Sequence, residues 1–129
     1  MSKLPLAFFA TAAVFALTGM MWGVKMGIAD NFTEAPAHAH LNLVGWASMA
    51  LMGAFYGYAG DRAPARLGWA NYAVSTVAVV IMVPSLAILL AGGGKINPGV
   101  ISGSLLALVG MALFLASVVT VWFAPRASA

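Results

Sequence analysis

The stretch that decides the fold is PAHAHLNLVGW, residues 36–46, which holds both histidines and opens a long apolar segment. Ionisable side chains inside a membrane-spanning segment are expensive, and by default they mark function. Residues two apart on an α-helix are rotated by roughly 200°, so we expect His38 and His40 on nearly opposite faces. They cannot chelate one metal together, because that needs a spacing of three or four residues. Each histidine is therefore expected to serve a different cleft.

The composition around this stretch is that of a membrane protein. Of the 129 residues, 63% are hydrophobic and only 7% are charged, whereas globular chains have about 25% charged residues. The net charge of +3 is too small for a nucleic-acid footprint, so no nucleic-acid partner is expected. The absence of cysteine excludes disulfides, thiolate metal sites and covalent c-type haem attachment. Any haem would therefore be held non-covalently, and haem b is the form we expect.

Four apolar segments are each long enough to cross the lipid bilayer, which takes about 20 residues. They cover about residues 4–29, 37–59, 67–91 and 99–123, and the loops between them are short. Short loops make neighbouring helices antiparallel, so we predict an all-α, up-down bundle of four transmembrane helices. The whole chain, 1–129, is then one domain. The first segment is longer than the apolar region of a typical signal peptide, so we expect it to be retained.

The basic residues predict how this bundle is oriented. Four of the six lie on one side and two on the other: Lys3, Arg62, Arg66 and Arg126 against Lys25 and Lys95. Cytoplasmic loops carry the excess of Lys and Arg, so both termini are expected in the cytoplasm. The histidines then lie near the periplasmic side of a bacterial inner membrane.

Contacts between the helices are expected at small and polar residues. Gly19, Gly23 and Gly27 form a stripe on the first segment, and such stripes let helices approach closely. The same spacing recurs at residues 53/57 and 99/103. The third segment carries Asn71, Ser75 and Thr76, which are predicted to hydrogen-bond to neighbouring helices.

The second segment has two different faces if it is a regular α-helix. One face carries the more polar set, His38, Asn42, Gly45, Met49 and Tyr56, with Met52 close by; the other carries His40, Leu43, Val44, Ala47 and Leu51. We expect the first face to be partly hollow, because Gly45 leaves space below His38. Neutral imidazole is a common ligand of haem iron, copper and zinc. The metal ligands are predicted to be His38 and His40, and the wider cofactor site to include Lys25, Asn42, Gly45, Trp46 and Met49.

The motif at 36–45, Pro-x-His-Ala-His-Leu-x-Leu-x-Gly, resembles one helix of the catalytic subunits of haem-copper oxidases and nitric oxide reductases. In that family the two histidines of a His-x-His pair bind two different haems on opposite sides of the helix. The subunit has twelve helices with approximate three-fold pseudo-symmetry, and its metal-ligand helices fall second in each group of four. By this resemblance the chain is similar to one four-helix third of the subunit.

The chain also departs from that family. It has no further histidine for the copper site, and its three carboxylates all lie in predicted loops, so the proton-channel acids are absent. A complete oxidase is therefore not expected, whereas haem binding still is.

Together these observations predict an integral membrane b-type haem protein, used for electron transfer or for sensing haem or a gas. Because the two histidines face apart, we expect bis-histidine ligation at subunit interfaces, with His38 of one chain paired to His40 of the next. The three-fold resemblance favours a homotrimer, with a dimer as the second choice. Two alternatives stay open: a copper-handling membrane protein, and a cofactor-free accessory subunit of a larger membrane complex. The sequence indicates no particular redox partner.

Overall fold

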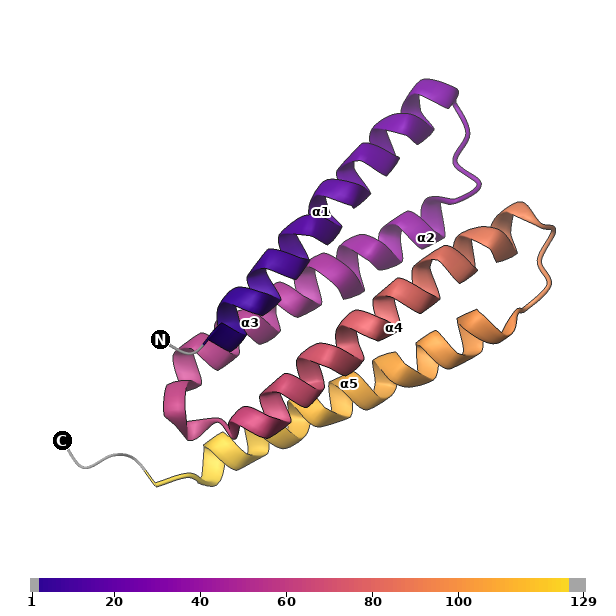
Figure 1. The fold of residues 1–129 in the computed structure, drawn as a ribbon. Helices are drawn as coiled ribbons and strands as arrows, with labels where there is room; N and C mark the ends of the chain where they lie inside the picture. Colours follow the sequence, from indigo (N-terminus) through magenta and orange to yellow (C-terminus); the bar gives the residue numbers. More distant parts are fainter. Residues whose placement is uncertain (1–2, 126–129) are drawn as a thin grey trace.

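The computed structural model describes residues 3–125, which form an elongated helical bundle without any strand (Figure 1). Its elements in chain order are α1 (Lys3–Ala29), α2 (Ala35–His40), the π-helix η1 (Leu41–Ser48), α3 (Met49–Ala59), the short 3₁₀ helix η2 (Gly60–Arg62), α4 (Ala65–Ala91) and α5 (Pro98–Phe123). The start of α1 and the end of α5 lie at the same end of the bundle, as an up-down arrangement requires. We call this end, which also holds η2, the arginine end. The opposite end, with the α1–α2 and α4–α5 loops, is the histidine end.

The limits of the long helices follow from their flanking residues. Helix α1 ends at Ala29, because the next residue, Asp30, has a φ of 48°, which an α-helix does not allow. Pro64 precedes the first residue of α4, and Gly92 follows its last. At the start of α5 the side chain of Asn97 accepts a hydrogen bond from the backbone N–H of Val100 (3.1 Å), which is an N-cap. All three helices match their predicted spans to within two residues at each end.

The second predicted span is helical throughout but is not one regular α-helix. Between α2 and α3 lies η1, a π-helical segment of eight residues, in which the turns are wider than those of an α-helix. The hydroxyl of Ser48 donates to the carbonyl of Leu43, five residues earlier (2.8 Å), and so provides an extra partner for the widened backbone. The prediction of a uniform helix over 37–59 is therefore wrong in its middle.

The membrane prediction is confirmed in part. Three helices, α1, α4 and α5, are long and apolar enough to cross a membrane by length and composition. The combined α2–η1–α3 segment is divided into elements of six, eight and eleven residues, none of which reaches that length alone. Many large apolar side chains on the long helices are exposed, as contact with lipid requires; on α5 they include Ile101, Leu105, Leu108 and Leu115.

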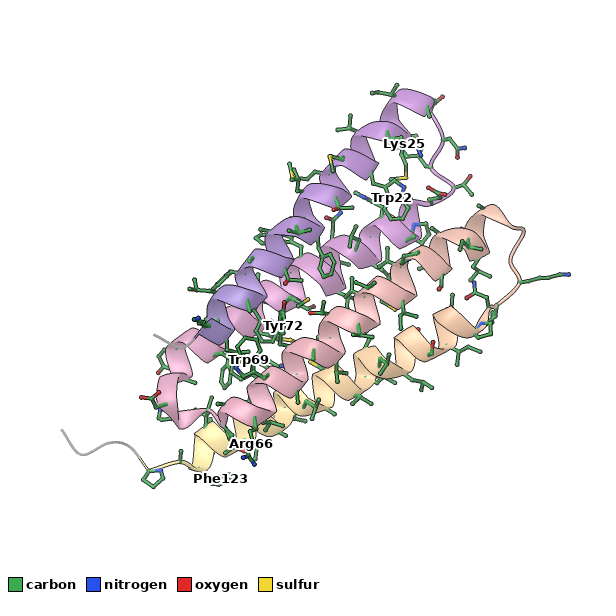
Figure 2. The ribbon with its side chains drawn as sticks, in the orientation of Figure 1. Trp22, Lys25, Arg66, Trp69, Tyr72 and Phe123 are labelled. Atoms are coloured by element: carbon green, nitrogen blue, oxygen red, sulfur yellow. The ribbon has the colours of Figure 1, made fainter. Side chains whose placement is uncertain are left out.

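The buried core lies mainly where α1 meets α3. It contains a cluster of six residues: Leu4, Phe8, Ala12, Met49, Met52 and Tyr56. Figure 2 shows Tyr72 and Trp69 of α4 beside this region, and the Tyr72 hydroxyl lies 2.8 Å from Thr11 Oγ1 of α1. A smaller cluster toward the histidine end joins the second segment to α4, through Leu41, Val79 and Val83. These two clusters fix the second segment against its neighbours.

Helices α4 and α5 approach each other closely at glycines, as the spacing predicts. A Cβ atom added to Gly103 would lie 2.7 Å from the backbone N and Cα of Met82. A Cβ at Gly110 would lie 2.5 Å from the hydroxyl oxygen of Ser75 and 3.5 Å from its Cα. The backbones of α4 and α5 therefore come nearer than side chains at these positions would allow.

A chain of hydrogen bonds crosses the core from α4 through α3 to α5. Asn71, fully buried, donates from Nδ2 to Tyr56 Oη (3.0 Å), and Ser75 donates to Asn71 Oδ1 (3.0 Å). Tyr56 Oη lies 2.9 Å from Ser117 Oγ, whose hydrogen goes to the carbonyl of Leu113 (3.1 Å). Because that hydrogen is already used, Tyr56 must be the donor to Ser117. The predicted role of Asn71 in linking helices is confirmed, whereas the hydrogen bond of Ser75 stays within α4 and orients Asn71.

Thr76 does not share this role. Its Oγ1 is buried and has no hydrogen-bond partner, so the prediction that Thr76 links helices is wrong. A buried hydroxyl without a hydrogen-bond partner makes the folded state less stable.

Candidate functional site

The two histidines lie on the short helix α2, at the histidine end of the bundle. Pro36 stands in the first turn of α2, where a missing backbone N–H costs nothing. His38 is half-buried and faces α1, whereas His40 is exposed. The structure therefore directs the two imidazoles to different surroundings, as their two-residue spacing predicts.

The ring of His40 is held by its own helix. Its Nδ1 lies 2.7 Å from the carbonyl oxygen of Pro36, one turn earlier. A carbonyl can only accept, so Nδ1 carries the hydrogen and Nε2 has the free lone pair. No hydrogen bond of Nε2 is found within residues 3–125. Metal-ligating histidines are typically oriented in this way, with one ring nitrogen donating to a backbone carbonyl and the other free to coordinate.

Two large apolar side chains that follow His40 in the sequence are also exposed. Leu43 and Trp46, three and six residues beyond His40, are 64% and 41% exposed. Trp46 is one of the predicted cofactor residues, and in the structure its side chain is exposed, as is that of His40. This segment thus exposes one imidazole and two large apolar side chains, which a flat apolar ligand or a second protein chain could cover.

The ring of His38 is enclosed by groups of its own chain. A Cβ atom added to Gly23 of α1 would lie 3.1 Å from His38 Cε1 and 3.5 Å from Nε2, so the imidazole packs directly on the α1 backbone. The indole of Trp22 stands edge-on to it, with ring centroids 6.4 Å apart. Asn42 Nδ2 lies 3.2 Å from Nε2 and 3.4 Å from Nδ1, so the amide sits across the ring. A ligand on His38 Nε2 would have to take the place that α1 occupies.

The glycine stripe on α1 explains this packing. Gly19 faces Asn42 just as Gly23 faces His38, so two glycines four residues apart receive two polar side chains four residues apart. Gly27, the third member of the stripe, has no atom within 4 Å of its added Cβ. The matching four-residue spacings in the sequence were a signal of this contact that the sequence analysis did not use.

The remaining predicted site residues of the second segment belong to the core. Gly45 does not open a hollow, and that prediction is wrong. A Cβ there would lie 3.0 Å from Phe15 Cδ2 and 3.2 Å from Val79 Cγ1, because these side chains fill the space. Met49 is only 1% exposed and belongs to the main apolar cluster.

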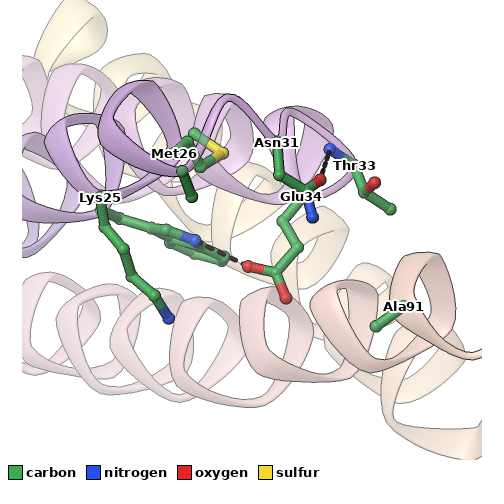
Figure 3. A pocket seen from close by; sticks show the side chains of 8 residues that line it. Lys25, Met26, Asn31, Thr33, Glu34 and Ala91 are labelled. Atoms are coloured by element: carbon green, nitrogen blue, oxygen red, sulfur yellow. Dashed lines mark hydrogen bonds between the residues drawn. The ribbon is translucent and has the colours of Figure 1, made fainter.

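A cavity of about 340 Å³ lies at the histidine end, between α1, the α1–α2 loop and the last residue of α4, and Trp22 forms part of its wall. Figure 3 shows Lys25 and Glu34 reaching toward the same space beside Trp22. The indole N–H of Trp22 donates to Glu34 Oε2 (2.9 Å), so the loop carboxylate is tied to α1. Neither Trp22 nor Glu34 is among the site residues predicted from the sequence. A contact across the α1–α2 loop, between residues twelve apart, has no periodic signal in the sequence.

Within residues 3–125 no group of three or more histidine, aspartate or glutamate side chains comes together as a metal-ligand set. The structure thus brings together His38, Asn42 and Trp22, with Lys25 nearby, and separates His40 and Trp46 from them. No known protein family, curated protein or solved structure matches this chain in comparisons of sequence and of fold.

Proposed function

We propose that this chain is a membrane-embedded b-type haem protein in which His40 supplies the axial ligand at an interface between two copies. One observation carries the proposal: the exposed His40 ring is fixed through Nδ1 to the Pro36 carbonyl, so its Nε2 is presented outward. Haem needs one or two axial ligands from the protein, so it does not require the three-residue cluster that this chain lacks within residues 3–125.

Bis-histidine ligation needs a second chain. His38 cannot serve as the second ligand in the same chain, because its Nε2 is covered by Gly23 and the ring faces α1. A two-fold dimer supplies a second His40 without any rearrangement, since such an interface brings the same patch of both copies together. The trimer that pairs His38 with His40 would require His38 to leave its contact with Gly23. The geometry therefore favours the dimer over the trimer.

The surroundings of His40 suit a porphyrin. The exposed Leu43 and Trp46 on the same segment offer apolar surface to the macrocycle, and a second chain would cover the face of the haem turned away from this one. Lys25, exposed at the same end of the bundle, is a candidate partner for the propionates of the haem. When bound, six-coordinate haem supplies one-electron transfer, so we assign the chain to electron transport and not to oxygen reduction.

The membrane placement is part of the same proposal. We place α2–η1–α3 in the bilayer as the fourth span, with both termini in the cytoplasm and the histidine end at the periplasmic face of a bacterial inner membrane. The basic residues at the arginine end, Lys3, Arg62 and Arg66 among the described residues, support this orientation.

The test is a haem titration of the purified full-length chain in mild detergent. We expect a low-spin Soret spectrum and, by native mass spectrometry, one haem per two chains. His40→Ala should abolish this spectrum, whereas the matched variant His38→Ala should retain it. Equal damage by both variants, with a trimeric mass, would overturn the His40–His40 arrangement in favour of the shared His38–His40 site. A copper signal, or no cofactor at all, would refute haem binding and favour copper handling or an accessory role.

A further inference from the structure

A groove lies at the arginine end, far from the histidines, between the α3–η2 turn and the last turns of α5. Its volume is about 800 Å³. Its walls are mostly apolar and aromatic, and one basic residue stands among them: Phe55, Tyr58, Val118, Val121 and Trp122, with Arg62. Figure 2 shows Arg66 and Phe123 at this same end of the bundle. The groove thus combines an apolar wall with a basic edge.

The charge of Arg62 is held at the groove by its own surroundings. The guanidinium carbon lies 5.5 Å from the centroid of the Tyr58 ring, which is a cation–π contact. Its Nε donates to the carbonyl of Ala59 (3.4 Å). No hydrogen bond from the two terminal guanidinium nitrogens is found within residues 3–125, so this planar pair of donors is open to an anion.

The exposure of the groove walls points to the same kind of ligand. Trp122 and Tyr58 are 80% and 81% exposed, and both have an apolar body with a polar edge that suits the boundary between lipid and water. Arg66 is exposed at the start of α4, so a second cation lies at this end of the molecule. Basic pockets between helices at the cytoplasmic face are typical binding sites for anionic lipid headgroups.

We propose that this groove binds an anionic phospholipid, with the phosphate held by Arg62 and an acyl chain lying along Val118, Val121 and Trp122. The planar guanidinium matches the geometry of phosphate oxygens, and the apolar wall of α5 supplies the contact for the hydrocarbon. The occupant is a lipid and not a free phosphate, because the groove is mostly apolar and opens on the surface where the lipid-facing helices end. The site rests on the proposed membrane orientation, but it is independent of haem and of the histidine end.

The test is native mass spectrometry of the full-length protein with equal amounts of dioleoyl phosphatidylglycerol and dioleoyl phosphatidylcholine. The wild-type chain should retain the anionic lipid at least about fivefold more tightly, the preference expected of one arginine near a membrane surface. Arg62→Gln should remove most of this preference. Lys95→Gln removes the same charge at the opposite end and should leave it unchanged. Val118→Trp, which fills the groove, should weaken retention of both lipids while Arg62 stays in place.

Three results would overturn the proposal. Equal retention of the two lipids by the wild-type chain would refute the site. Equal losses of preference in Arg62→Gln and Lys95→Gln would refute it too, because they would show that the total charge of the protein, and not the position of Arg62, causes the preference. Displacement of the lipid by glycerol phosphate at equal concentration would show that the acyl chain contributes nothing. Circular dichroism of each variant, matching that of the wild type, ties these changes to binding and not to unfolding.

Discussion

The substitution Tyr56→Phe tests the hydrogen-bond chain that joins three helices in the core. It removes one oxygen and leaves the ring, so the stacked contact with Phe8 (centroids 5.4 Å apart) is kept. Two hydrogen bonds are lost, the one from Asn71 and the one to Ser117. Asn71 is fully buried, and its Nδ2 then retains only the sulfur of Met52 at 3.7 Å, a weak acceptor.

The expected cost follows from these two losses. Hydrogen bonds between helices in a membrane protein contribute about 0.6 kcal/mol each on average, with a maximum near 1.7. The two bonds therefore account for about 1.2 kcal/mol, and leaving the Asn71 N–H without a good acceptor raises the total toward about 2 kcal/mol. Ser117→Ala removes the bond from Tyr56 and, within α5, the bond to the Leu113 carbonyl; the lost link between helices should cost about 0.6 kcal/mol. The double variant should cost about 0.6 kcal/mol less than the sum of the two single ones, since both remove the same bond.

The assay is reversible unfolding in mixed micelles, followed by circular dichroism as the fraction of dodecyl sulfate rises. Tyr58→Phe is the matched control, because Tyr58 is exposed and its hydroxyl lies outside the core chain; its unfolding curve should be that of the wild type. A Tyr56→Phe variant as stable as Tyr58→Phe would refute the hydrogen-bond chain. So would strictly additive single and double variants.

Two further stability predictions rest on other contacts of α4 and α5. Thr76→Val removes the buried hydroxyl that has no partner and should stabilise the fold by about 1 kcal/mol. The control Thr120→Val removes an exposed hydroxyl bonded to its own helix and should change the stability by less than about 0.5 kcal/mol. A loss of stability in Thr76→Val would mean that the Thr76 hydroxyl has a hydrogen-bond partner after all. Gly103→Ala should destabilise by about 1–3 kcal/mol, because its Cβ would overlap the backbone of Met82. Gly27→Ala has no atom within 4 Å and should be neutral or slightly stabilising, so equal effects of the two alanines in thermal unfolding would contradict the close α4–α5 contact.

Much of the fold was predictable because it depends on local patterns. The three long helices follow from apolar length and from flanking residues such as Asp30 and Asn97, and the α4–α5 contact follows from glycine spacing. The opposed directions of His38 and His40 need only helical geometry, and the short helix α2 provides it. These are properties of one segment, or of one pair of neighbours.

What could not be predicted depends on which side chains from distant segments reach the same space. The hollow expected beside Gly45 is filled by Phe15 and Val79, which are thirty or more residues away in either direction. The enclosure of His38 depends on its packing against α1, so the sequence alone could not tell which of the two histidines is exposed and available to a ligand. The Trp22–Glu34 bond depends on how the α1–α2 loop turns back, which no periodicity encodes.

The π-helical segment Leu41–Ser48 has a consequence for how the two ends of this helix are related. Each of its turns holds more residues than an α-helical turn, so it shifts the rotational phase of His38 and His40 relative to Met49 and Tyr56. In a uniform α-helix, adding or removing one residue rotates everything beyond it by roughly 100°. Here the wide π-helical turns can tighten to α-helical turns, and this change would compensate the rotation caused by the loss of one residue. We therefore expect that deleting one residue between the histidines and the core would leave both ends of this helix with their present neighbours.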